Sequence, residues 1–252
     1  MGYSCYYLTR NSLTFTAPAM VATASLGLDI TSIGVITSIF PLCYGCSKFV
    51  SGVVGDVLSP SVMLGGGLIA TGLVNIAFGA SSTLPLFCML WAINGILQGF
   101  GAPSCAKILT SWFAAKERGT YWGMWNIAHN LGGFAAPILA GTAARTLGWS
   151  WGLWAPGIIA LVFGSVILLT LKDSPEDRGF GPVEQTKQVV VDPAKSASEN
   201  EQAVEKQPSL LQNLFQNVLS NPFIWGLAFT YFCVYVVRQV RVSRPETFGA
   251  TS

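Results

Sequence analysis

Long apolar runs alternate with short polar links over most of the chain. We place six runs before residue 172 and a seventh after residue 220, at 1–24, 32–57, 62–81, 85–108, 119–143, 149–171 and 222–240. Each is close to the roughly 20 residues that an α-helix needs to cross a bilayer. A spanning segment has to pair its backbone polar groups within itself, so every run predicts a helix. The pattern therefore predicts an all-α membrane protein.

The stretch between the sixth and seventh runs differs in composition. Residues 173–220 hold 12 of the 26 charged residues, which predicts a solvated linker rather than a further span. The pattern thus divides the chain into a six-helix transmembrane bundle at 1–172, a cytoplasmic linker at 173–220, a seventh helix at 221–240 and a tail at 241–252. Because the tail is polar, we expect the seventh helix to be incomplete.

Composition supports the same assignment. Charged residues make up 10% of the chain, whereas soluble domains carry about 25%. The net charge of +2 is too small to indicate nucleic-acid binding. The six cysteines lie in apolar runs without metal-ligand spacing, so we expect neither a metal nor a cofactor. The chain has no nucleophile elbow and no phosphate-binding P-loop, so we do not expect an enzyme.

Basic residues are distributed unevenly between the links. The links after the first, third and fifth runs contain only Arg145, and those after the second, fourth and sixth contain Lys107, Lys116, Arg118, Lys172, Arg178, Lys187, Lys195 and Lys206. Because basic loops stay in the cytoplasm, we expect the six-helix block to begin and end there.

One eight-residue pattern occurs twice. The stretches "YSCYYLTR" and "YFCVYVVR" both fit Y-x-C-x-Y-x-x-R. On a helix the two tyrosines and the arginine fall on one face, at i, i+4 and i+7. The residues are Tyr3, Tyr7 and Arg10 in the first copy and Tyr231, Tyr235 and Arg238 in the second. The repeat predicts the first helices of two related halves.

The apolar runs also carry cations at depth. These are Arg10, Lys48, His129 and Arg238, whereas the nearest acidic residue, Asp56, stands at the end of its run. A cation at mid-membrane costs at least about 2.5–3.5 kcal/mol. Since the chain supplies no matching anion, we expect the counter-ion to be an anionic substrate. Arginine suits this task because its planar guanidinium holds phosphate or carboxylate through two hydrogen bonds.

Each of these residues has a structural alternative. The two arginines and Lys48 can extend to the membrane surface, and the tyrosines can form an interfacial belt. His129 can be neutral and hydrogen-bonded within the bundle, or its titration can couple proton uptake to anion binding. Gly95 and Gly99 form a GxxxG arrangement, which predicts close helix packing with or without sliding.

Five longer stretches resemble a known family. They read "GYSCYYLTRNSLTFTAPAM", "YGCSKFVSGVVGD", "LQGFGAPSCAKILTSWFAAKERGT", "GMWNIAHNLGGFAAPILAG" and "KDSPEDRGFGP". Together they resemble the organophosphate:phosphate antiporters of the major facilitator superfamily, which include hexose-phosphate and glycerol-3-phosphate transporters. The resemblance implies a twelve-helix fold of two six-helix bundles around a central cavity, of which this chain is the N-terminal portion.

The resemblance also implies roles for individual residues. Arg10 and Arg238 correspond to the paired arginines that bind substrate phosphate, and His129 and Lys48 match basic residues near them. Tyr7 and Tyr235 match the tyrosines that precede each arginine. Gly52 and Asp56 match a gating motif after the second helix, but the basic residues that usually follow it are missing, and Asn11 stands where many relatives have a basic residue.

The function expected from this resemblance is exchange of a sugar phosphate for inorganic phosphate by alternating access. The sugar phosphate would be a hexose phosphate or glycerol 3-phosphate, and the full-length protein a monomer. Two alternatives stay open: a membrane sensor that binds sugar phosphate, and a transport-inactive truncated product. Plasma membrane, endoplasmic reticulum and plastid envelope are all compatible with the sequence.

Overall fold

The computed structural model describes residues 2–181, 222, 226, 229–230 and 233. The chain divides into two compact units, Met1–Lys187 and Gln188–Ser252. In the second unit the described residues are helical and lie in the run predicted at 222–240. The rest of that run, most of the linker and the tail lie outside the described residues.

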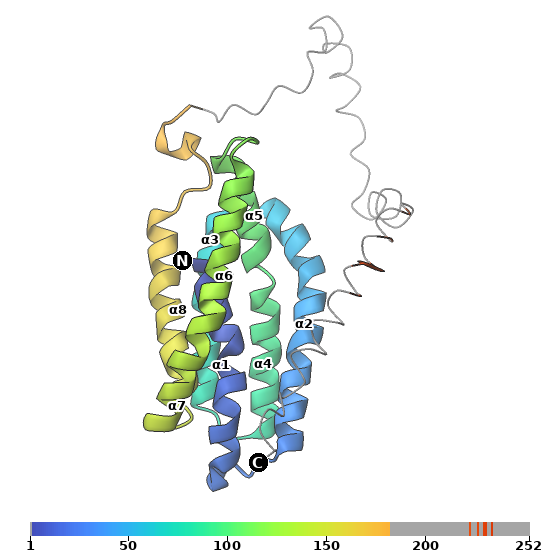
Figure 1. Cartoon of the computed structure of the whole chain (residues 1–252), viewed down its shortest axis with the longest axis vertical. Helices are drawn as coiled ribbons and strands as arrows, with labels where there is room; N and C mark the ends of the chain where they lie inside the picture. Colours follow the sequence, from blue (N-terminus) through green and yellow to red (C-terminus); the bar gives the residue numbers. More distant parts are fainter. Residues whose placement is uncertain (1, 182–221, 223–225, 227–228, 231–232, 234–252) are drawn as a thin grey trace, which may run out of the picture. The chain divides into compact units, whose positions relative to one another are not determined.

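The first unit is built from helices alone over its described residues. In chain order they are α1 (Gly2–Ala22), η1 (Ala24–Leu26), α2 (Ile30–Val57), α3 (Pro60–Gly79), α4 (Leu84–Gln98), α5 (Gly101–Trp112), α6 (Arg118–Ala136), η2 (Pro137–Gly141), α7 (Thr142–Thr146), α8 (Trp151–Thr170) and η3 (Glu176–Arg178). Figure 1 shows the long helices running side by side. The predicted all-α fold is confirmed.

Two of the predicted runs, 85–108 and 119–143, are each interrupted by a helical irregularity. Around Gly99 and Phe100 the backbone donates to carbonyls three residues back, and α4 ends and α5 begins there. Pro103 explains the break, since it has no N–H to donate to the Gly99 carbonyl. Pro137 likewise opens the π-helical turn η2 between α6 and α7.

Helix starts differ slightly from the predicted boundaries because polar caps extend the helices. Asp29 accepts a hydrogen bond from the Ser32 amide at 2.8 Å, so α2 begins at Ile30 and not at residue 32. Ser59 caps α3 in the same way, with Pro60 at the first helical position.

The helices α1 and α6, which carry polar residues within their apolar runs, are neighbours in the bundle. Four stretches are long and apolar enough to cross a membrane within the described part of the chain: Ile30–Lys48, Pro60–Gly79, Leu84–Trp112 and Trp151–Thr170. The helices α1 and α6 do not reach this threshold, since they carry polar residues such as Arg10, Asn11 and His129. Because α1 packs extensively against α6, these polar residues collect in one region of the bundle.

The most extensive helix contact in the first unit is between α3 and α8. A Cβ atom added to Gly72 would lie 2.7 Å from the Gly157 carbonyl oxygen, and one added to Gly157 would lie 3.0 Å from the Gly72 carbonyl. The same reciprocal contact recurs at Gly65 and Gly164. The two backbones therefore touch directly, as small residues allow between membrane helices.

The core consists of two apolar clusters that meet along α1. One contains Leu13 and Met20 with the rings of Phe78, Phe87 and Trp91. The other surrounds the ring of Tyr6 and includes residues from α3, α5 and α8. Between them on α1, the hydroxyl side chains of Thr9 and Ser12 are fully buried.

The segment after α8 ties three helices together at one end of the bundle. The Ser61 amide at the start of α3 donates to Asp173 Oδ1 at 2.7 Å. Trp112 Nε1 at the end of α5 donates to the Lys172 carbonyl at 2.9 Å. This end, which we call the basic end, also carries Lys107, Lys116, Arg118 and Arg178.

Candidate anion-binding site

Arg10 lies among aromatic rings from two helices. Its guanidinium carbon is 4.9 Å from the ring centroid of Tyr7 on α1 and 4.4 Å from that of Tyr44 on α2. Phe40 adds a third ring at 5.7 Å. Ring faces attract cations, so these rings orient the guanidinium without neutralising its charge. The Nε atom of Arg10 is buried and has no hydrogen-bond partner among the described residues.

Tyr44 links Arg10 to the second predicted cation. The Lys48 ammonium lies 4.8 Å from the Tyr44 ring centroid, and the Lys48 side chain is exposed. Tyr44 precedes Lys48 by four residues, so both stand on one face of α2. The sequence analysis missed Tyr44, although this spacing from Lys48 was available as a signal.

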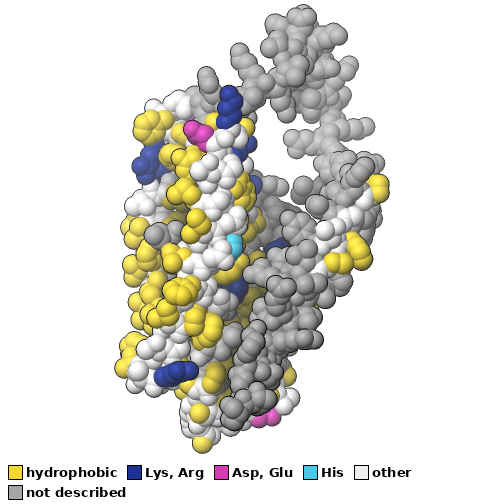
Figure 2. Space-filling view, in the orientation of Figure 1, with side chains coloured by type: hydrophobic (Ala, Val, Ile, Leu, Met, Phe, Trp, Pro, Cys, Tyr) yellow, Lys and Arg dark blue, Asp and Glu magenta, His cyan; other side chains and the backbone are white. Residues whose placement is uncertain are grey.

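Tyr7 links Arg10 to the third cation candidate in the same way. The rings of Tyr7 and His129 stack with centroids 5.1 Å apart and an interplanar angle of 27°. The structure therefore brings four of the predicted residues together, with Tyr44, in the order Lys48, Tyr44, Arg10, Tyr7, His129. Figure 2 shows the histidine on one face of the bundle, close to the dark blue atoms of basic side chains.

A close approach of α1 and α6 sets the position of His129. Ser4 Oγ donates to the Ala128 carbonyl at 2.6 Å. A Cβ atom added to Gly132 would collide with the Ser4 carbonyl and would lie 2.9 Å from Tyr7 Cβ. Because glycine leaves room here, the His129 ring reaches Tyr7.

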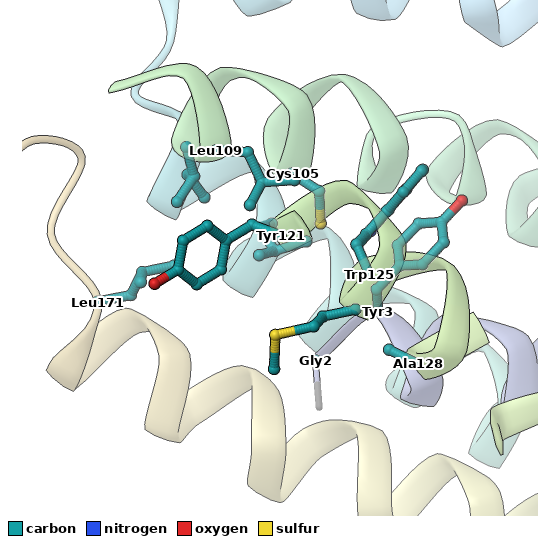
Figure 3. Close-up of a pocket in the computed structure, with 11 residues that line it drawn as sticks. Gly2, Tyr3, Cys105, Leu109, Tyr121, Trp125, Ala128 and Leu171 are labelled. Atoms are coloured by element: carbon teal, nitrogen blue, oxygen red, sulfur yellow. The ribbon is translucent and has the colours of Figure 1, made fainter. Parts of the chain in front are cut away.

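Tyr3 belongs to the protein interior and not to the surroundings of the guanidinium. Its ring is buried, with centroids 4.8 Å from Trp125 and 5.5 Å from Tyr7. It lines an apolar cavity of about 360 Å³ that also includes Cys105 and Trp125. Figure 3 shows the Tyr3 and Trp125 rings side by side, with the Cys105 thiol facing the same space. Tyr3 thus supports Tyr7 and His129 through ring packing.

Gly95 of α4 and Gly99, directly after its end, set the distance to α2. A Cβ atom added to Gly95 would lie 2.9 Å from the Phe40 carbonyl oxygen, and one added to Gly99 would collide with Ser47. These contacts lie within one turn of Tyr44, so they hold this part of α2 against α4.

The remaining predicted residues are only partly described. Gly52 and Asp56 belong to the last two turns of α2, and their side chains lie outside what the structure describes. Nearby, the Lys107 ammonium donates to the Gly55 carbonyl. Tyr231, Tyr235 and Arg238 lie outside the described residues.

The charge of the region is unbalanced. In sequence terms Asp56 is the only acidic residue within the helices that make up the bundle from residue 2 to residue 170. Arg10 and Lys48 share the ring of Tyr44, so two basic side chains meet at one aromatic residue. Such a cluster attracts an anion with several acceptor oxygens.

Comparison with known sequences decides the family. Residues 1–244 match the sequence profile described as Major Facilitator Superfamily. The chain belongs to the major facilitator superfamily. It is accordingly a multi-pass membrane protein. The bundle of residues 2–170 is the part of this fold that the structure describes.

Individual relatives carry transport and sensor names. The "Probable hexose phosphate transport protein" of Chlamydia muridarum is 42% identical over 241 residues, 94% of this chain and 52% of that protein. The "Membrane sensor protein UhpC" of Salmonella typhimurium is 40% identical over 238 residues, 94% of this chain and 52% of that protein. The "Glycerol-3-phosphate transporter" of Bacillus subtilis is 35% identical over 253 residues, 98% of this chain and 55% of that protein.

These relatives confirm the resemblance to the organophosphate:phosphate antiporter family. The chain spans about half the length of the curated relatives that it matches. The activity of a whole transporter therefore enters below as a proposal.

Proposed function

We propose that this bundle supplies one half of the binding site of a sugar-phosphate transporter, and that the complete natural protein exchanges sugar phosphate for inorganic phosphate. The observation that carries the proposal is the row of Lys48, Tyr44, Arg10, Tyr7 and His129, which brings two basic side chains and a histidine together through two tyrosine rings. The names of the relatives support a sugar phosphate as the organic substrate.

Arg10 is the principal phosphate ligand in this proposal. A guanidinium donates two parallel hydrogen bonds to one phosphate and stays charged at every physiological pH. Lys48 adds a second positive charge, and His129 adds a further hydrogen-bonding group. Arg238, from the other half of the repeat, is proposed to meet the same phosphate from the opposite bundle.

Exchange follows from the electrostatics. Without an anion, the site holds cations in a region of low dielectric constant, which is costly. A bound dianion offsets that cost, so the loaded protein changes its open side more readily than the empty one. Phosphate entering from one side then replaces sugar phosphate leaving on the other, with the two bundles rocking about the central site.

Replacing Arg10→Lys tests the proposal. Lysine keeps the charge but loses the two-bond geometry, so we expect exchange of labelled phosphate for sugar phosphate in proteoliposomes to fall about 10- to 100-fold. The matched control is Arg145→Lys, since Arg145 is an exposed arginine in the last turn of α7. Full exchange by the Arg10→Lys protein would refute Arg10 as the phosphate ligand.

A sensor is the second candidate, because one of the 40%-identical relatives is named a membrane sensor. A sensor needs the same ligands but no net movement of substrate. Saturable binding of sugar phosphate to the purified protein, without exchange in vesicles, favours the sensor. The positive control is a known transporter that is active in vesicles prepared in the same way. Loss of both binding and exchange favours the transport-inactive product.

A further inference from the structure

A second polar cluster lies inside the bundle, between α1, α3 and α4. Its members are all buried, with exposed fractions of 2% or less: Thr9, Ser12, Thr71, Asn75, Asn94 and Gln98. Their neighbours on either side are the two apolar clusters of the core. Buried amides in such surroundings are costly unless their hydrogen-bonding atoms are paired.

Hydrogen bonds join most of these residues into one chain. Gln98 Nε2 donates to Thr9 Oγ1 at 3.0 Å, and Ser12 Oγ donates to the Thr9 carbonyl at 2.8 Å. Ser12 also contacts Asn75 Oδ1 at 3.3 Å, and Asn75 Nδ2 donates to the Thr71 carbonyl at 2.9 Å. The chain therefore crosses from α4 through α1 to α3.

Four buried atoms of this cluster have no hydrogen-bond partner among the described residues. They are Thr71 Oγ1, Gln98 Oε1, Asn94 Nδ2 and Asn94 Oδ1. Asn94 stands one turn before Gln98 on the same face of α4. Since α1 and α4 run in opposite directions (Figure 1), that turn faces the part of α1 just beyond Thr9, where Ser12 lies.

We propose that Asn94 and Gln98 form an internal site that binds water. The unpaired atoms include both donors and acceptors, which is what a bridging water requires. All the side chains of the cluster are neutral, and the sequence places the positive charge of Arg10 directly after Thr9. A metal cation is therefore a poor ligand, because no carboxylate is present to offset that charge.

The site is connected to Arg10 through the backbone. Thr9, which accepts from Gln98, also donates to carbonyls of the preceding turn of α1, at 3.1 Å for Cys5 and 3.0 Å for Tyr6. Water held between Asn94 and Gln98 would fix the Gln98 side chain and, through Thr9, the turn of α1 that carries Arg10.

Two isosteric substitutions in the complete natural protein test the proposal. Asn75 is a buried amide with protein partners, so Asn75→Leu must lower the midpoint of thermal unfolding and serves as the reference. If water binds Asn94, the Asn94→Leu protein loses comparable hydrogen bonds, and we expect its midpoint to fall by about 2–8 °C. An unchanged or raised midpoint would overturn the proposal, because removing truly unpaired polar atoms is neutral or stabilising.

Two further measurements use the unsubstituted protein and the pair of amides. The midpoints of Asn94→Leu, Gln98→Met and the double variant should not add, since both amides share the water; strict additivity would contradict the site. A cryo-EM map that resolves ordered water should show density within hydrogen-bond distance of Asn94 and Gln98, and a dry site would refute it. If sodium ions raise the midpoint of thermal unfolding and choline does not, the ligand of the site is a cation and the proposal of water is wrong.

Discussion

At the scale of single residues, aromatic rings hold the cations in place. Tyr44 lies beside both Arg10 and Lys48, and Tyr7 lies between Arg10 and His129. Each ring offers its electron-rich face to a positive charge and lets the charge stay available to a ligand. Orientation of the cations by rings, and not by carboxylates, is what leaves the region positive.

Tyr44 offers the sharpest residue-level prediction. Tyr44→Leu removes the ring from both cations, so we expect the dissociation constant for inorganic phosphate to rise about 3- to 30-fold. Tyr44→Phe keeps the ring face and is the matched control, with affinity close to that of the original protein. Equal losses in the two variants would mean that the hydroxyl group, and not the ring, orients the cations.

The sequence nominated most of this row but not its internal contacts. Charge at membrane depth pointed to Arg10, Lys48 and His129, and helical spacing added Tyr7. Spacing alone treated Tyr3 as equivalent to Tyr7, whereas Tyr3 is buried against Trp125. The spacing of Tyr44 from Lys48 could have indicated their contact, but the contact of Tyr44 with Arg10 depends on how α2 packs against α1, which a linear pattern does not contain.

At the scale of helices, the pair α3 and α8 depends on the absence of side chains. We expect Gly72→Ala to destabilise the protein by about 1–3 kcal/mol, since the new methyl group would lie 2.7 Å from the Gly157 carbonyl oxygen. Gly66→Ala on the same helix has nothing within 4 Å of the added atom and is the control. The midpoint of thermal unfolding in detergent is measured for both variants. Equal midpoints would show that α3 and α8 move apart to accept the methyl group without loss of stability.

The cap that Asp173 places on α3 predicts a pH dependence. Burial raises the pKa of Asp173, but hydrogen bonds from Ser59 and Ser61 outweigh it, so the pKa lies below its ordinary value. A carboxylate with a lowered folded-state pKa stabilises the protein above its unfolded pKa of about 3.9, and this contribution is lost as the pH falls through the lowered value.

Asp173→Asn should therefore lower the unfolding midpoint at pH 7, by the equivalent of about 1 kcal/mol for a helix cap. The gap between the variant and the original protein should close as the pH falls below the Asp173 pKa. Unfolding curves from pH 7 to strongly acidic buffer provide the measurement, and a gap that stays constant over this range would exclude the carboxylate as the cause.

Helix existence was predictable, and helix irregularity was not. The six apolar runs before residue 172 begin and end within a few positions of the outer bounds of the long helical segments, but they contain none of the internal breaks. The break between α4 and α5 and the turn η2 follow from Pro103 and Pro137, which an apolar count treats as ordinary residues. Caps such as Asp29 lie outside the apolar runs, so the predicted start of α2 was two residues late.

At the scale of the whole molecule, the charge asymmetry between the two ends predicts the orientation in the membrane. The basic end carries Lys116, and the opposite end carries Arg145. With the basic end in the cytoplasm, an impermeant thiol reagent added outside intact cells should label Arg145→Cys but not Lys116→Cys. The six native cysteines have to be replaced first. The reverse labelling would invert the orientation.

The glycines that join α3 to α8 are seven residues apart on both helices: Gly65, Gly72 and Gly79 on one and Gly157 and Gly164 on the other. Seven residues are close to two full turns of an α-helix, so these glycines lie along one narrow stripe of each helix. Deleting one residue between Gly65 and Gly72 would rotate everything beyond it by about 100°. Bulky side chains would then face α8, so this pair of helices is far less tolerant of a lost or gained residue than of an exchanged one.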